Sequence, residues 1–390
     1  MPRGAERRET RTPGAPAADP CAGSPGPSAP AAADRRAAPV CAGRRAARLL
    51  GLGLLAALLV APAFAGLAAA APAAPETLCT VRDPRLLELS GLAVDGSGGI
   101  WAMSDGGSRV ALYRMDPATC AVTDTRTAPI DPFDAEDLAL GPDGTFWVAD
   151  TGDNNRARET VALIAVPPRG EARLYRLTYP DGPHDAEAVV VGADGVPIVV
   201  TKEISGVAGA YRPVGPLTGP GPTPLMRAGS VGFARSDTTG GPIGALGAFT
   251  VTGGATTADR SVMAVRTYTD AWLYRVPASG DLVAALQGTP VRVPLPEEPQ
   301  GEAIAFTADG TLLSGSETRG LGKGQLRAVE GAAALLPAVA PATPEPPPPA
   351  AAPPEPRPEW LPAAIGGGVA VVVLGLAAGA MALHSRRRRV

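Results

Sequence analysis

Five segments of the chain share one pattern, in which an alternating apolar run, a polar turn and a second alternating run follow one another. The copies span residues 91–105, 136–150, 187–203, 254–268 and 302–317. In four copies the turn contains an Asp-Gly pair, whereas the fourth copy has Asp259 followed by Arg260. Alternation on both sides of an Asp-Gly turn is typical of a β-hairpin, so each copy predicts two antiparallel strands.

Two further strand-like runs follow most copies, as at 110–115 and 121–128. Four short strands recurring about every 45–50 residues are typical of a propeller blade. The sequence therefore predicts an all-β fold, a β-propeller of five four-stranded blades over 79–330, with six blades as the alternative. One longer interval contains 213–247, rich in Gly, Pro and Thr, which we interpret as an insertion and a candidate binding patch. We expect 79–82 to supply an outer strand that closes the ring.

The two ends of the chain do not have the composition of a folded core. Residues 1–43 are rich in Pro, Ala and Arg and predict a disordered extension. Residues 44–71 combine arginines, a short apolar run and small residues, which predicts a secretory signal peptide, with an uncleaved anchor as the alternative. The Pro-rich stretch 337–362 predicts an extended stalk, and the uncharged stretch 363–383 predicts a transmembrane helix. The basic tail at 384–390 then predicts a single-pass plasma-membrane protein with its propeller outside the cell and its C-terminus in the cytoplasm.

Cysteine usage fits this topology. Cys21 and Cys41 precede the signal peptide, and Cys79 and Cys120 are left in the exported part. Two cysteines in an oxidising compartment predict one disulfide bond. In the apolar stretch near the C-terminus, a pair of glycines four residues apart predicts a weak dimer contact between helices. These glycines are Gly375 and Gly379.

Four groups of residues carry a resemblance to known proteins. They are Glu136 to Ala139, Asp150 to Asn154, Tyr179 to Glu187, and Gln300 to Ala303. The repeat as a whole resembles NHL-type propeller repeats. These four groups resemble more closely a family of exported, membrane-anchored actinobacterial β-propellers, and the last group is also similar to phytase-related "esterase-like" propellers. The resemblance implies the fold, whereas propellers serve many unrelated functions.

Acidic residues recur where the first strand of a copy starts and where its second strand ends. Hairpin geometry places these points at one face of a propeller, so the acids are expected around one mouth of the central channel. They are Asp105, Asp134, Glu136, Asp137, Asp150, Asp153, Asp185, Glu187, Glu203, Glu302 and Glu317. Carboxylate oxygens in this number suit Ca²⁺, and the resemblance to calcium-dependent propeller hydrolases of the phytase and gluconolactonase kinds implies the same ion. The expected ligands are Glu136, Asp150, Asn154, Glu187 and Glu302.

The same acids have two other interpretations. They can latch neighbouring blades by binding backbone N–H groups or arginines, and Arg156, Arg158 and Arg266 are available for such pairs. In a catalytic interpretation, His184 is the candidate general base and Lys202 the electrophilic helper. With two histidines in the whole chain, sites built from several imidazoles are excluded.

Charge narrows the choice of partners. Basic residues gather at the two ends of the chain, which leaves 79–330 acidic. An acidic domain repels nucleic acid and other polyanions. We therefore expect a non-catalytic cell-surface module that holds an extracellular protein, peptide or glycan on its acidic face. A Ca²⁺-dependent extracellular hydrolase of ester or phosphoester bonds is the alternative.

Overall fold

The computed structural model describes residues 72–318, 324–336 and 361–387. The predicted extension at 1–43 and signal peptide at 44–71 lie outside the described residues, as does the predicted stalk up to residue 360. Up to residue 336 the described chain is built from β-strands joined by turns and a few short helices. The prediction of a mostly β fold is confirmed.

The strands come in groups of four along the chain. One sheet contains β2 (Leu89–Val94), β3 (Ile100–Ser104), β4 (Val110–Met115) and β5 (Val122–Ala128). Two further groups are β6 (Asp137–Leu140), β7 (Phe146–Asp150), β8 (Val161–Val166) and β9 (Arg173–Thr178), then β10 (Ala186–Val191), β11 (Pro197–Thr201), β12 (Val207–Pro213) and β13 (Thr223–Gly232). These eight strands join into one sheet because the outer strands β9 and β13 pair briefly in parallel. The remaining sheets contain β14 (Val251–Thr256), β15 (Val262–Thr267), β16 (Asp270–Arg275) and β17 (Val291–Pro294), then β18 (Gly301–Phe306), β19 (Leu312–Ser316), β20 (Gln325–Val329) and β1 (Glu76–Thr80).

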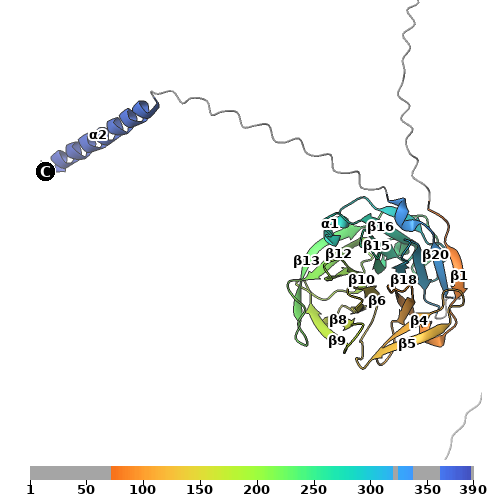
Figure 1. Ribbon diagram of the computed structural model, residues 1–390. Helices are drawn as coiled ribbons and strands as arrows, with labels where there is room; N and C mark the ends of the chain where they lie inside the picture. The colour runs from red at the N-terminus through yellow and green to blue at the C-terminus, as the bar shows by residue number, and fades with distance from the viewer. Residues whose placement is uncertain (1–71, 319–323, 337–360, 388–390) are drawn as a thin grey trace, which may run out of the picture. The chain divides into compact units, whose positions relative to one another are not determined.

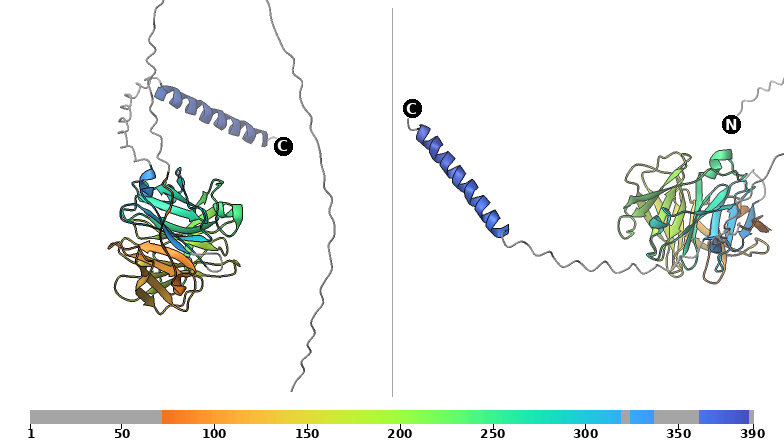
Figure 2. Two further views of the ribbon diagram at one scale, coloured as in Figure 1. Left: turned by 90° about the vertical axis from the view of Figure 1, so that its right-hand side faces the viewer. Right: turned by 90° about the horizontal axis from the view of Figure 1, so that it is seen from above.

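The first strands of the groups form a closed ring. In the order β2, β6, β10, β14 and β18, each of these inner strands contacts the next, and β18 contacts β2. The other strands of each group lie progressively farther from the centre (Figure 1), and Figure 2 shows the same body from two further sides. Apolar side chains fill the spaces between neighbouring sheets, as where Trp101 and Leu112 of one sheet pack with Phe146 and Val148 of the next. The described body is a β-propeller.

The N-terminal strand closes the ring. β1 pairs antiparallel with β20, so the last sheet takes its outermost strand from the start of the domain, as predicted. Cys79 of β1 forms a disulfide with Cys120, between β4 and β5, and this prediction is confirmed. The bond links the closing sheet to the first sheet across 41 residues of sequence. Loop-closure entropy for such a separation corresponds to about 4 kcal/mol of stability in the chain-entropy model.

The interpretation of 213–247 as an insertion is wrong for a large part of that segment. Thr223–Gly232 forms β13, which pairs with β12 and completes the third group of strands. The strand contains Pro224 and two glycines. Proline and glycine weaken a strand pattern, but an outer strand with few partners tolerates them.

Four short helical segments and one longer helix complete the described chain. They are η1 (Pro84–Leu86), η2 (Gly244–Ala248), α1 (Leu282–Ala285), η3 (Ala332–Leu335) and α2 (Leu361–Arg387). None of the helices in the described residues combines the length and apolar content needed to cross a membrane. The prediction of a transmembrane helix at 363–383 is therefore not supported by the structure.

Candidate functional site

Four of the five inner strands carry an extra residue near their start. The register shifts place Ser90, Glu187, Thr252 and Glu302 at this position in β2, β10, β14 and β18. Glu136 holds the corresponding place before β6, where its N–H donates to the Ala149 carbonyl at 2.8 Å. A β-bulge redirects its side chain and often lies beside a functional site. The same backbone device thus recurs at one end of the channel.

The side chain at the bulge differs between the copies and so does its role. In two copies it carries a hydroxyl that latches the next blade: Ser90 Oγ donates to the Glu136 carbonyl, and Thr252 Oγ1 donates to the Gly301 carbonyl at 2.8 Å. In the other three copies it is a glutamate. Glu136, Glu187 and Glu302 lie close enough to interact electrostatically with one another. The structure brings these three predicted ligands together.

A compact group of carboxylates forms around two of these glutamates. One oxygen from each of Glu136, Asp185 and Glu187 lies within 4.8 Å of the others, and all three residues are buried. We call these three residues, with Glu302 beside them, the acidic cluster. Asp185 was expected on the acidic face but not among the ligands. The sequence held a signal for it, because Asp-Ala-Glu occurs at 134–136 and again at 185–187.

Gly152 allows two acidic side chains to approach each other. A Cβ built on Gly152 would lie 2.1 Å from Glu136 Oε1 and 2.5 Å from Asp134 Oδ2. These distances are far below a van der Waals contact, so a residue with a side chain would displace both carboxylates. The backbone therefore leaves room for a pair of carboxylates at the edge of the acidic cluster.

Lys202 is the cation that the structure places in contact with the cluster. Its Nζ donates to Glu187 Oε1 and lies 5.6 Å from the centre of the Tyr268 ring. Burial alone would lower the pKa of Lys202, but Glu187, Tyr268 and Asp185 together raise it by more. Lys202 thus stays an ammonium group and balances only one of the carboxylates around it.

The pKa values of the three glutamates in the acidic cluster are raised, as expected where carboxylates outnumber cations. Burial, followed by the charges of Glu187 and Asp134, raises the pKa of Glu136 well above its ordinary value. Burial and then Glu187 do the same for Glu302. Burial raises the pKa of Glu187 itself to about 7, although Lys202 opposes the change. Near neutral pH the cluster must take up protons or another cation.

Further acidic residues extend from Glu302, and we call Glu317, Glu88 and Asp105 the outer arm. Gln300 Nε2 donates to Glu302 Oε1 at 3.0 Å, and burial raises the pKa of Glu317 next to it. Farther along, burial and the charges of Glu88 and Glu317 raise the pKa of Asp105 to about 7. One oxygen of this carboxylate, Asp105 Oδ1, is buried and has no hydrogen-bond partner among the described residues.

Two of the five expected ligands, Asp150 and Asn154, do not belong to the acidic cluster. Asp150 Oδ1 accepts hydrogen bonds from the N–H groups of Phe133 and Asp134 at 3.1 and 2.9 Å, and from Arg158 Nη2 at 3.0 Å. Asn154 is exposed in the loop that follows. The latch interpretation therefore describes Asp150, whose bonds tie the strand end to the preceding loop.

Asp137 and Asp153 also hold backbone together. Asp137 Oδ2 accepts from the N–H groups of Val189 and Gly254 at 2.8 and 2.9 Å, which ties β6 to β10 and β14. Complete burial raises the pKa of Asp137 to about 8. Asp153 accepts from the N–H groups of residues 157 and 158 and shapes its own loop. Both carboxylates were expected on the acidic face, and the structure uses them as structural acceptors.

His184 belongs to a separate polar group. Its Nε2 lies 3.1 Å from Asp181 Oδ1 and 3.0 Å from the Tyr211 hydroxyl, which itself donates to Asp181 Oδ2. Its Nδ1 lies 3.6 Å from Glu203 Oε1, and Glu203 also binds Arg156. The imidazole is thus held by an acid and a phenol. The catalytic role of His184 stays a prediction.

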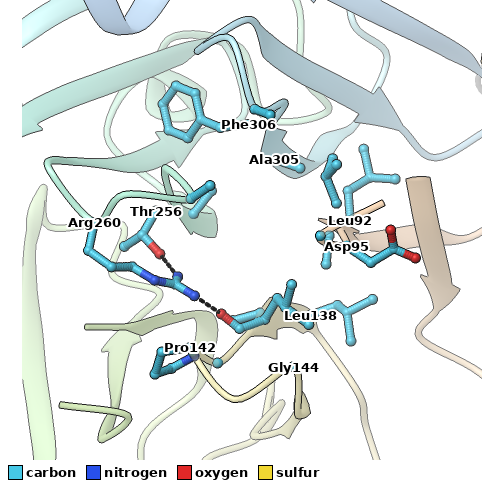
Figure 3. Close-up of a pocket in the computed structure, with 18 of the residues that line it drawn as sticks. Leu92, Asp95, Leu138, Pro142, Gly144, Thr256, Arg260, Ala305 and Phe306 are labelled. Carbon is cyan, nitrogen blue, oxygen red and sulfur yellow. Dashed lines mark hydrogen bonds between the residues drawn. The ribbon is translucent and has the colours of Figure 1, made fainter. Parts of the chain in front are cut away.

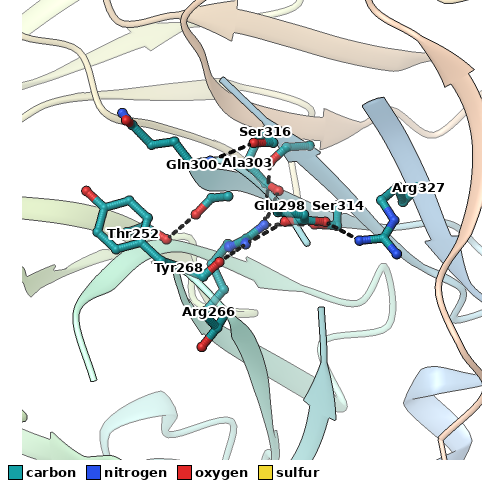
Figure 4. Close-up of polar contacts among 12 residues, drawn as sticks. Thr252, Arg266, Tyr268, Glu298, Gln300, Ala303, Ser314, Ser316 and Arg327 are labelled. Carbon is teal, nitrogen blue, oxygen red and sulfur yellow. Dashed lines mark hydrogen bonds and ion pairs between the residues drawn. The ribbon is translucent and has the colours of Figure 1, made fainter. Parts of the chain in front are cut away.

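A second buried ionic group lies between the last two sheets (Figure 4). Arg266 is completely buried and donates from Nη2 to Glu298 Oε2 at 2.8 Å and from Nη1 to the Ala303 carbonyl at 3.0 Å. Ser314 Oγ bridges the two side chains, and Arg327 Nη1 lies 3.5 Å from Glu298 Oε1. Here the one carboxylate, Glu298, has two guanidinium groups beside it, and the other guanidinium donors bind uncharged acceptors. Arg266 was expected to pair with acids of the acidic face, but its partner is Glu298, which was not among them, and its bond to the Ala303 carbonyl links two sheets.

Comparison with known proteins finds only distant similarities to solved structures. Neither a protein-family model nor a curated protein sequence matches this chain. A streptogramin B lyase structure is 12% identical with a TM-score of 0.31, over 62% of this chain and 65% of that one, less than two thirds of its length. A gluconolactonase from Xanthomonas campestris is 14% identical with a TM-score of 0.35, over 62% and 71%. The PQQ-bound aldose sugar dehydrogenase from Streptomyces coelicolor is 11% identical with a TM-score of 0.36, over 67% and 99%.

These identities show what the chain resembles in fold class, not what it does. The resemblance to NHL-type and actinobacterial propellers stays a prediction. So does the similarity to phytase-related propellers.

Proposed function

We propose that this chain is a five-bladed propeller that acts as a binding module and holds a Ca²⁺ ion at the acidic cluster. The observation that carries the proposal is the buried trio of Glu136, Asp185 and Glu187, whose oxygens lie within 4.8 Å of one another. Among the residues that the structure describes, Lys202 is the ammonium group in contact with them. Buried carboxylates in excess of their cations require a counter-charge, and a hard cation supplies it with no change of protonation.

The donor set fits Ca²⁺ better than a softer metal. Ca²⁺ takes six to eight oxygen ligands, and carboxylates are its usual protein donors. Glu136, Asp185 and Glu187 would hold the ion, with Glu302 at its side. Three carboxylates leave coordination positions for water and for oxygens of a ligand. Bound there, the ion would supply an electrophilic anchor for the hydroxyl, carbonyl or carboxylate oxygens of a peptide or glycan.

One observation favours the alternative, a Ca²⁺-dependent hydrolase of ester or phosphoester bonds. The pKa of Glu187 lies at about 7. A carboxyl group with such a pKa can both give and take a proton near neutral pH, as a general acid–base catalyst must. In this alternative Glu187 moves the proton, while Lys202 beside it stabilises negative charge on the reacting group.

The proposed location is outside the cell. The disulfide between Cys79 and Cys120 supports it, because such bonds persist in oxidising compartments. Export by a signal peptide is part of this proposal. Attachment to the plasma membrane and pairing of chains through Gly375 and Gly379 stay predictions.

Calcium-dependent stabilisation tests the proposal. We expect the melting temperature of the chelator-treated chain to rise when Ca²⁺ is added, because a ligand that binds only the folded state stabilises it. At a hundred times its dissociation constant the ion adds about 2.7 kcal/mol, which corresponds to roughly 5–10 °C for a domain of this size. Differential scanning calorimetry with and without millimolar Ca²⁺ measures the shift.

Two variants locate the effect. Glu136→Gln should lose most of the shift, because it removes one charged ligand. Glu203→Gln removes an equal charge from the pair with Arg156 and should keep the shift. An unchanged melting temperature in the wild-type chain would reject the Ca²⁺ site. Ester or phosphoester hydrolysis that needs Ca²⁺ and disappears in Glu187→Gln would favour the hydrolase.

A further inference from the structure

The turn of the fourth copy differs from the other four in one residue. Each turn contains a residue in the left-handed conformation whose N–H binds the carbonyl three residues earlier. In four turns this residue is a glycine, with φ between 74° and 81°: Gly98, Gly144, Gly195 and Gly310. In the fourth turn it is Arg260, with φ 59°. Glycine adopts this conformation without strain and arginine does not. The contacts of the arginine side chain must therefore explain why an arginine stands here.

The side chain of Arg260 reaches back to the channel. Its Nη1 donates to the Val191 carbonyl at 3.2 Å. Nη1 also donates to Thr256 Oγ1, and Nη2 donates to the Leu140 carbonyl at 2.7 Å (Figure 3). All three acceptors are uncharged. Arg260 Nε is buried and has no hydrogen-bond partner among the described residues. The guanidinium group is thus fixed in place, and in the described part of the chain it forms no hydrogen bond to a carboxylate, although the charge of neighbouring Asp259 acts on it.

A cavity of about 400 Å³ opens at this end of the channel. Its walls include Leu92, Leu138, Ala305 and Phe306, which come from three different inner strands (Figure 3). The cavity is also lined by residues of the turns that follow these strands, such as Asp95, Gly141 and Ala308, whereas the acidic cluster lies at the first residues of the strands. The cavity therefore belongs to the opposite mouth of the channel.

Charge in the cavity is uneven. Arg260 and Asp95 are the charged residues among the described ones that line it. Asp95 is engaged by its own turn, since Oδ1 accepts from the N–H groups of Ser97 and Gly99 and Oδ2 accepts from Trp101 Nε1 at 2.8 Å. Arg260 binds uncharged acceptors. An entering anion would meet a positioned guanidinium group inside apolar walls.

We propose that this mouth binds a small apolar molecule with one anionic group, such as an aliphatic or aromatic carboxylate. The apolar body would lie against Leu92, Leu138 and Phe306, and the anion would pair with Arg260. A volume of about 400 Å³ lies at the small end of ligand-binding cavities. Guanidinium groups bind carboxylates through strong charge-assisted hydrogen bonds. This proposal is independent of Ca²⁺ binding at the other mouth.

Calorimetric titration of the purified full-length chain with octanoate and 1-octanol tests it. The two probes share a chain length and differ in charge. We expect octanoate to bind at least about tenfold more tightly than octanol, because a hydrogen bond to a charged group contributes that much. Arg260→Gly, which restores the residue of the other turns, should weaken octanoate about tenfold and leave octanol unchanged. Arg156→Gln, an equal change of charge on the other face, should alter neither affinity.

Several results would overturn the proposal. They are absence of octanoate binding, equal affinities for the two probes, or unchanged octanoate binding in Arg260→Gly. If Arg260→Gly does not fold, Arg260→Gln keeps a donor for the Leu140 carbonyl and removes the charge, so the octanoate-to-octanol ratio decides. Octanoate affinity that disappears with chelator would place the anion at the acidic cluster and would also reject the site at Arg260.

Discussion

Two buried ionic groups in this propeller differ in their balance of charge. Around Arg266, Glu298 supplies one carboxylate, Arg327 a second cation, and Ser314 and backbone carbonyls take the remaining donors. In the acidic cluster, several carboxylates share Lys202. We call the Arg266 group balanced because its carboxylate does not lack a cation, and the fold itself explains its contacts. The unbalanced one holds charge that the fold does not compensate, and this difference, rather than burial or acidity, marks the candidate site.

Both groups depend on a glycine that lets charged atoms come close to the backbone. A Cβ on Gly301 would lie 2.0 Å from Arg266 Nη2 and 2.3 Å from Glu298 Oε2, much as a Cβ on Gly152 would meet Glu136 and Asp134. The same packing device serves both. Close approach of charged atoms to a glycine therefore does not indicate a functional site. The sign and number of the charges do.

The largest expected effect breaks the balanced group. Glu298→Gln leaves Arg266 buried without its counter-charge, and we expect a loss of about 3–5 kcal/mol in the free energy of unfolding. Urea denaturation followed by circular dichroism measures it. Glu203→Gln, which breaks a partly exposed pair with Arg156, should cost less than about 1 kcal/mol. Similar losses in the two variants would contradict the importance of burial for the Arg266 group.

The same substitution in the unbalanced group should have the opposite sign. Without Ca²⁺ at pH 8, Glu136→Gln replaces a buried carboxylate that Glu187 and Asp134 repel by a neutral side chain of the same shape. We expect the free energy of unfolding to rise by about 1–2 kcal/mol. Urea denaturation in chelator-containing buffer measures this. A loss of stability would instead make Glu136 a structural latch.

The sequence predicted the ring because every copy repeats the same alternation and turn. It also placed Glu136, Glu187 and Glu302 at one mouth, since hairpin geometry alone carries the start of each copy there. It did not separate them from Asp150, because the bonds of Asp150 to Arg158 and to backbone N–H groups depend on loop conformation. The three glutamates and Asp150 were expected on the same face and thus have two different roles.

Two other features were beyond the reach of pattern alone. β13 was missed because its proline and glycines hide a strand that forms only by pairing with β12. The change from glycine to Arg260 was visible, but as degeneracy of the repeat. Its meaning depends on a positive φ and on carbonyl groups from two other copies, and neither can be inferred from local sequence.

The smallest expected effect concerns the outer arm of acids. Burial raises the pKa of Asp105 from 3.8 to about 7, so between these values the folded chain keeps a proton that the unfolded chain has lost. Stability should therefore fall as pH rises through this window. Asp105→Asn removes that part of the slope and should be the more stable form at pH 8 by about 1 kcal/mol, less than the whole shift implies because Asp105 is only partly buried.

Urea denaturation at pH 5 and pH 8 in chelator-containing buffer measures the slope for both chains. Asp124→Asn, on the exposed strand β5, serves as the control and should keep the wild-type slope. If Asp105→Asn also keeps the wild-type slope, ionisation of Asp105 does not destabilise the folded chain. The excess of carboxylates over cations is then confined to the acidic cluster. If the slope decreases as expected, the shortage extends along the arm through Glu317, and the unbalanced region is wider than the three carboxylates that would hold an ion.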